Sequence, residues 1–148
     1  MTPEQKPVYA RSCFLCKEIF TSTGKRKSSF CPECHTSPLF NVASSLLGQI
    51  RRAEKAGLSA NVTFEQWLST LDFFEGMCAY CQIVPYKCID HFFPFELGGG
   101  TTWDNIAPAC HGCNHRKGSH LPEEILQPDE LERVRTYLYT RFDMEVTR

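Results

Sequence analysis

Apolar residues recur at helical spacing in two stretches of the chain, and turn-forming residues mark where each stretch ends. The first stretch predicts a helix over residues 41–56, which Gly57 can end in a left-handed cap. The second predicts a helix that begins after Thr63, because Thr63 and Gln66 have the spacing of a capping box, and Gly76 can end it. The two apolar stripes consist of Val42, Leu46, Leu47, Ile50 and Ala53, and of Phe64, Trp67, Leu68, Leu71 and Phe74.

After these helices the pattern changes to short elements. Residues 86–93 predict a β-strand, residues 98–100 form a glycine turn, and residues 101–107 predict a second strand that returns beside the first. Residues 111–117 then predict a short helix that Gly118 closes.

Two further helix starts follow, one at Pro122 and one at Asp129, which has Glu132 three residues later. The apolar face of the last helix consists of Leu131, Val134, Leu138 and Phe142. Helices flank one pair of short strands, and no repeat is present beyond the duplicated Cys-x-x-Cys pattern, so the sequence predicts a small α+β fold.

Eight of the nine cysteines fall into four Cys-x-x-Cys pairs. Paired knuckles of this kind are typical of closed tetrahedral zinc sites, and the sequence predicts two of them. Disulfides are the competing explanation, but the N-terminus lacks the pattern of a secretory signal, which favours the reducing cytoplasm and zinc. The ninth cysteine, Cys88, is expected to be an inert core thiol. The predicted ligands are Cys13, Cys16, Cys31 and Cys34 for one ion, and Cys78, Cys81, Cys110 and Cys113 for the other.

The cysteine pairs suggest how the chain is divided. We expect an N-terminal zinc-ribbon-like module over residues 1–40 and a helical linker over residues 41–76. A zinc-stapled core is expected over residues 77–121, followed by C-terminal helices over residues 122–148.

Charge is unevenly distributed although the formal net charge is only −1. Residues 1–56 hold nine Lys and Arg against four acidic residues, and residues 57–148 hold seven against thirteen. Whole-protein charge therefore does not indicate nucleic-acid binding, and any such affinity has to come from local basic patches. No apolar run approaches the ~20 residues that a membrane span needs.

The second pair of knuckles brackets a set of residues suited to metal-assisted hydrolysis. In order, the segment carries Cys-x2-Cys, Asp90-His91, a glycine turn, Asn105 and then Cys-x2-Cys-Asn-x2-Lys. This order resembles the HNH endonucleases, the ββα-metal or His-Me finger group. The resemblance implies a small zinc-stabilised ββα-metal domain, here preceded by an N-terminal zinc ribbon and a helical linker.

The resemblance also implies a role for each polar residue. His91 would be the general base that takes a proton from the attacking water, and Asn105 would hold the imidazole in position. Asp90 and Asn114 would ligate a catalytic Mg²⁺ or Mn²⁺ ion. Such enzymes leave 5′-phosphate and 3′-hydroxyl ends.

The last of the three residues that give the HNH motif its name differs from the usual one in this chain. That position is often histidine, whereas this chain has Asn114, an arrangement similar to that of phage recombination endonuclease VII. An amide oxygen favours magnesium or manganese over softer transition ions. His115 is the alternative ligand.

Five basic residues are candidate contacts to nucleic acid: Lys25, Arg26, Lys27, Arg116 and Lys117. For each of them a solvated surface position is the alternative. A similar choice holds for Arg51, Arg52 and Lys55, which either follow DNA or complement the negative end of a helix dipole.

The sequence thus predicts an HNH endonuclease that hydrolyses DNA; the rival is a non-catalytic zinc module that binds nucleic acid or a protein. Because the base must be neutral and the reference pKa of histidine is ~6.5, activity is expected to fall below about pH 6. Cutting both strands would favour a homodimer. Neither the target nor the choice between nicking and double-strand cutting can be read from the residues.

Overall fold

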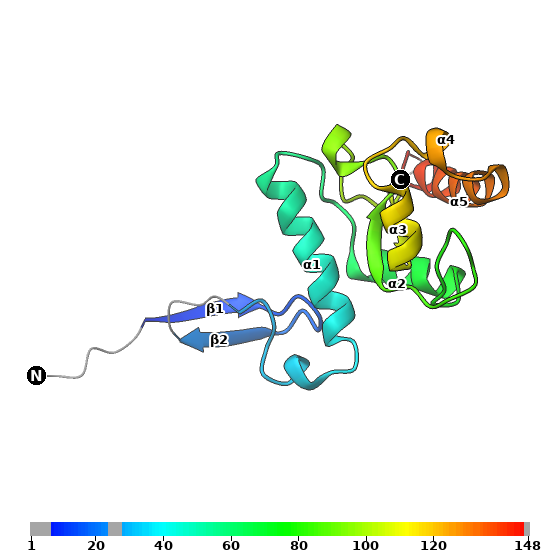
Figure 1. The fold of residues 1–148 in the computed structure, drawn as a ribbon. Helices are drawn as coiled ribbons and strands as arrows, with labels where there is room; N and C mark the ends of the chain where they lie inside the picture. Colours follow the sequence, from blue (N-terminus) through cyan, green and yellow to red (C-terminus); the bar gives the residue numbers. More distant parts are fainter. Residues whose placement is uncertain (1–6, 24–27, 147–148) are drawn as a thin grey trace, which may run out of the picture. The chain divides into compact units, whose positions relative to one another are not determined.

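The computed structural model describes residues 7–23 and 28–146, with side chains as far as Arg141. The chain divides into two compact units, Met1–Leu47 and Gly48–Arg148. Among the described residues, each unit holds a two-stranded antiparallel sheet and one group of four cysteines, as Figure 1 shows for the sheets. The predicted α+β class is confirmed.

The N-terminal unit is built on a β-hairpin. Strand β1 (Val8–Ser12) pairs with β2 (Ile19–Thr23), and the short helix η1 (Cys34–Thr36) begins at the last cysteine of the second knuckle. Phe30 is buried between the knuckles, and its ring meets that of Phe40 edge-on at 5.0 Å. A core this small needs a further staple, which the four cysteines can supply.

Both predicted long helices are confirmed. Helix α1 (Phe40–Lys55) ends before Gly57, whose φ of 71° is the left-handed conformation expected of a glycine cap. Helix α2 (Phe64–Phe73) begins with the predicted capping box, in which the Thr63 hydroxyl accepts from Gln66 N and the Gln66 side chain accepts from Thr63 N.

The segment bracketed by the second four-cysteine group folds as two strands and a helix, with α3 lying against β3 (Figure 1). Strand β3 (Cys88–His91) pairs antiparallel with β4 (Ile106–Ala109), so that Asp90 lies opposite Ala107. Helix α3 (His111–Lys117) matches the predicted range and ends at a glycine with positive φ.

The second strand differs from the prediction, which placed it over residues 101–107. Residues 101–105 form a turn instead, since the backbone N–H groups of Asn105 and Ile106 both donate to the carbonyl of Thr102. Alternating side chains cannot reveal such a turn, and the strand begins only where pairing with β3 becomes possible.

Two helices close the second unit, α4 (Pro122–Ile125) and α5 (Pro128–Val146), with Pro122 in the first turn as predicted. Trp67 is buried in the core, as its place in the apolar stripe of α2 predicts. Tyr137 is also buried, and its hydroxyl donates to the Thr70 hydroxyl at 2.9 Å. None of the helices in the described ranges is long and apolar enough to cross a membrane.

Candidate active site and metal centres

Each group of four cysteines brings its Sγ atoms within 4.8 Å of one another. The Sγ atoms of Cys16 and Cys31 are 3.8 Å apart, which is about the edge of a tetrahedron with Zn–S bonds of about 2.3 Å. Both groups, predicted from their spacing, are therefore compatible with zinc. They consist of Cys13, Cys16, Cys31 and Cys34, and of Cys78, Cys81, Cys110 and Cys113.

Backbone N–H groups prepare one thiol in each group for ionisation. Burial alone raises the pKa of a thiol, but these hydrogen bonds outweigh it and lower the pKa of Cys13 to about 6 and that of Cys81 to about 7. Cys88 belongs to neither group. Burial raises its pKa to about 11, which favours the neutral thiol, and its Sγ donates to the carbonyl of Ala109. The side chain is half-buried, and its expected inertness stays a prediction.

Asp90 is buried on β3 and is held by two other buried side chains. The Lys117 ammonium lies 3.2 Å from its Oδ2 atom, and the Tyr80 hydroxyl donates to the same oxygen. Burial raises the pKa of the Asp90 carboxyl, while Lys117 and Tyr80 act in the opposite direction by stabilising the carboxylate. Lys117 also donates to the carbonyl of His91 at 2.7 Å, so it fixes the backbone that carries both residues.

His91 follows Asp90 and is also buried, with 5 % of its surface exposed. Its Nε2 atom lies 2.9 Å from the Thr101 hydroxyl, and the ring of Phe95 packs edge-on at 5.4 Å. Burial, together with the positive charges of Arg52 and Lys117, lowers the pKa of His91 to about 4. The imidazole is therefore neutral at neutral pH, as a general base has to be.

Asn105 lies where the loop between the two strands closes. Its Oδ1 atom accepts from Phe93 N at 2.8 Å, and its Nδ2 atom donates to the carbonyls of Gly100 and Phe93. The sequence prediction had Asn105 holding the imidazole, but the ring's hydrogen bond is made by Thr101. Asn105 instead joins the two ends of the loop that carries Thr101.

The glycine turn in this loop is closely packed. A Cβ atom on Gly99 would lie 1.9 Å from the carbonyl oxygen of Phe93, and one on Gly100 would lie 2.6 Å from that of Ser59. Glycine is needed here because the backbone passes directly against other backbone. The glycine turn that the sequence predicts is therefore a closely packed part of the loop that leads to Thr101.

The second unit has a cleft of about 480 Å³, which Asp90 and His91 border and which Asn105 and Thr101 do not line. Asp90 and His91 line it from β3, and Asn114 and His115 line it from α3. Both candidates for the last motif residue, Asn114 and His115, therefore border the cleft. Asp90 and Asn114 supply the oxygen donors that a hard divalent ion prefers.

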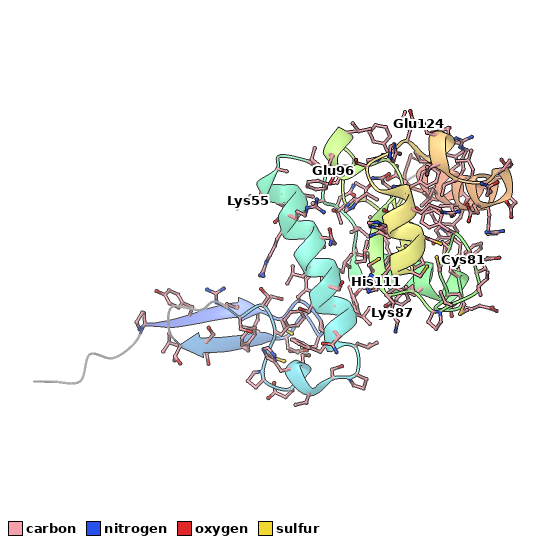
Figure 2. All side chains as sticks on the ribbon, viewed as in Figure 1. Lys55, Cys81, Lys87, Glu96, His111 and Glu124 are labelled. Carbon is pink, nitrogen blue, oxygen red and sulfur yellow. The ribbon has the colours of Figure 1, made fainter. Side chains whose placement is uncertain are left out.

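Arg52, near the end of α1, lines the same cleft. Its guanidinium lies 3.8 Å from the centre of the Phe95 ring and 3.4 Å from a carboxylate oxygen of Glu96. Glu96, labelled in Figure 2, lies on the short helix η2 (Phe95–Leu97) that follows β3. The Arg52 side chain remains half-exposed, so it presents a positive charge at the rim beside His91.

The basic residues predicted to contact nucleic acid have different environments. Arg116 donates to Glu130 at 2.7 Å and stays partly exposed. Lys117 is fully buried against Asp90 and His91, so the structure assigns it an internal role in place of the expected phosphate contact. Lys25, Arg26 and Lys27 lie outside the described residues.

Three residues of the site carry no clear sequence signal. Thr101 begins a stretch for which the sequence predicts a strand, and Tyr80 lies inside a cysteine knuckle. Arg52 was noted only as one of several basic residues at the end of a helix. Their roles depend on contacts between residues far apart in the chain, such as the 52-residue separation between Thr101 and Gln49.

Comparison with known proteins bears on this segment. Residues 78–129 match the sequence model of a family described as HNH endonuclease. The Septu protein PtuB of Bacillus thuringiensis is 30% identical over 70 residues, which cover 41% of this chain and 27% of that relative. The chain thus matches about a quarter of the length of this relative. No solved structure matches the chain.

Proposed function

We propose that this chain, whose residues 78–129 form an HNH endonuclease domain, hydrolyses phosphodiester bonds of DNA with a divalent metal ion. The observation that carries the proposal is the cleft of the second unit. There a neutral imidazole, that of His91, borders the same space as the carboxylate of Asp90 and the amide of Asn114. A base and two oxygen donors are the protein groups that metal-assisted hydrolysis needs.

His91 accepts a proton from the attacking water, and its lowered pKa keeps it free to do so at neutral pH. Asp90 and Asn114 hold Mg²⁺ or Mn²⁺, with His115 as the alternative to Asn114. The few protein ligands suit Mg²⁺, which usually keeps several waters. When bound, the ion neutralises charge on the scissile phosphate and on the departing oxygen. Lys117 holds the Asp90 carboxylate in position, because its buried ammonium lies 3.2 Å from Asp90 Oδ2.

Arg52 binds a phosphate of the substrate at the rim of the cleft. Stacking on Phe95 holds the guanidinium plane, and its contact with Glu96 is long and exposed, so a phosphate can compete for the N–H groups. Arg52 and His91 line the same cleft, and the Arg52 charge is near enough to help lower the pKa of His91.

Arg52→Gln is expected to lower kcat/KM for DNA cleavage by about 10- to 100-fold, the worth of one charge-assisted hydrogen bond. Glutamine keeps the helix propensity of the site, so the fold is preserved. Lys55→Gln removes the same charge one turn later on an exposed position and should change the rate by less than about threefold at moderate salt. An equal loss of kcat/KM in both variants would show that the net positive charge of the helix end, and no specific phosphate contact of Arg52, affects cleavage.

The pH dependence of cleavage follows from His91. The base is neutral above its pKa of about 4, so the rate should stay level as pH falls through 6 and decline only below about pH 5. The pH at which the rate declines is therefore lower than the value of about 6 expected from the reference pKa of histidine. Single-turnover rates between about pH 4.5 and 8, with circular dichroism as a control for unfolding, measure it. A decline centred near pH 6.5 would contradict the environment described for His91.

The proposed function is tested by incubating the purified protein with supercoiled plasmid in Mg²⁺, in Mn²⁺ or in EDTA. Conversion to open-circular or linear DNA that needs the divalent ion is the expected result, with 5′-phosphate ends on the products. Linear products, with a dimeric mass in solution, would add double-strand cutting by a homodimer. DNA binding that is unchanged by EDTA, with no cleavage of plasmid, branched DNA or RNA, would favour a zinc-dependent binding module.

A further inference from the structure

The imidazole of His91 is supported by a chain of two hydrogen bonds that ends on helix α1. His91 Nε2 lies 2.9 Å from Thr101 Oγ1, and Thr101 Oγ1 lies 3.2 Å from the carbonyl oxygen of Gln49. All three residues belong to the second unit, and Thr101 is fully buried.

The protons of this chain can be assigned by elimination. A carbonyl oxygen only accepts, so the single proton of the Thr101 hydroxyl points to Gln49. If that proton pointed to His91 instead, the buried Thr101 oxygen and the half-buried Gln49 carbonyl oxygen would face each other at 3.2 Å with no proton between them. Thr101 must therefore accept from His91, and Nε2 carries the proton.

This assignment fixes the tautomer of the ring. With the proton on Nε2, the lone pair is on Nδ1, and among the described residues no hydrogen bond engages that atom. His91 lines the cleft, so Nδ1 is the ring nitrogen left to accept a proton there. Hydrogen bonding at one ring nitrogen commonly decides the state of the other in this way.

We propose that Thr101 is a positioning residue that holds His91 as the Nε2–H tautomer and leaves Nδ1 as the base atom; this rests on the proposed nuclease function. Thr101 is itself held from outside the matched domain, because its backbone N–H donates to the carbonyl of Ser59 at 2.8 Å. Gln49 and Ser59 both precede residue 78. The end of α1 and the segment after it are therefore part of the active site, and more than a linker.

The imidazole ¹⁵N spectrum of His91 tests the tautomer directly, with the signal assigned by its loss in His91→Gln. The wild-type protein should show a protonated Nε2 and a bare Nδ1 at pH 7. Thr101→Ser keeps the hydroxyl and should keep this pattern. Thr101→Val has nearly the same shape but cannot accept, so Nε2–H loses its partner and the Nδ1–H form should appear. A wild-type ring protonated on Nδ1 would overturn the proposal, and this measurement needs no variant to fold.

Cleavage provides a second measurement. Thr101→Val should lower kcat by about 10- to 100-fold with KM unchanged, since unpairing a buried donor has a cost of that size. Thr101→Ser should restore cleavage to within about threefold of wild type. A Thr101→Val variant that cleaves at the wild-type rate, or retains the wild-type spectrum, would contradict the proposed role. If the wild-type protein cleaves nothing, the proposed function fails while the spectrum still decides the tautomer.

Discussion

Replacement of His91 by alanine is expected to lower the rate of DNA cleavage by about 100-fold or more, the usual contribution of a general base. The expectation rests on the position of the ring at the cleft and on its lowered pKa of about 4. Magnesium binding should persist, because Asp90 and Asn114 are unchanged. The loss should appear in single-turnover rates at saturating DNA and leave KM nearly as it was.

A lower rate in His91→Ala can come from loss of the base or from unfolding of the unit, and control variants distinguish the two causes. His91 is buried and packs against Phe95, so alanine leaves a cavity that can destabilise the unit. His91→Gln fills most of that space and should be as inactive as alanine while its Tm stays closer to wild type. His111→Ala makes the same chemical change on an exposed turn of α3, labelled in Figure 2, and should cleave normally. A His91→Ala variant that cuts at the wild-type rate would remove His91 as the base.

The elements that could be predicted from sequence are those with local signals. Helix α2 begins at a capping box, and helix α3 lies between a cysteine knuckle and a glycine. In each case the residues that decide the boundary lie within a few positions of it. The four-cysteine groups are similar, because a metal knuckle is a local turn whose spacing is visible in the chain.

The parts that could not be predicted depend on long-range contacts. Lys117 stands beside Arg116 at the end of a helix, where sequence alone suggests either a phosphate contact or a solvated charge. It is buried only because β3 brings Asp90 and the carbonyl of His91 to the ammonium. Thr101 was placed in a strand for a related reason, since nothing near it reveals that Asn105 closes a loop there.

The second large effect is expected from the cysteines of the second unit, whose thiols are part of its hydrophobic core. Cys78 and Cys113 are buried in one cluster with side chains from α2, β4 and α5, namely Phe74, Ala107, Ala109, Val134, Tyr137 and Leu138. Structural zinc contributes about 10–16 kcal/mol in small zinc-finger peptides, whereas a domain is stable by only about 5–15 kcal/mol. Cys78→Ser should therefore unfold the second unit, abolish cleavage and reduce bound zinc from about two ions to one per chain.

The N-terminal unit offers the matched control, because it has its own four cysteines and its own buried residues. Cys31→Ser should lose the other zinc ion and unfold only that unit, while the second unit keeps its thermal transition and cleaves plasmid. Circular dichroism, calorimetry and zinc content measured on both variants distinguish the two sites. Retention of two zinc ions and an unchanged melting curve in Cys78→Ser would show that this group is no structural metal centre. A different result is loss of cleavage in Cys31→Ser while the second unit keeps its thermal transition. The N-terminal unit would then be needed for substrate binding, because its loss would leave the catalytic core folded.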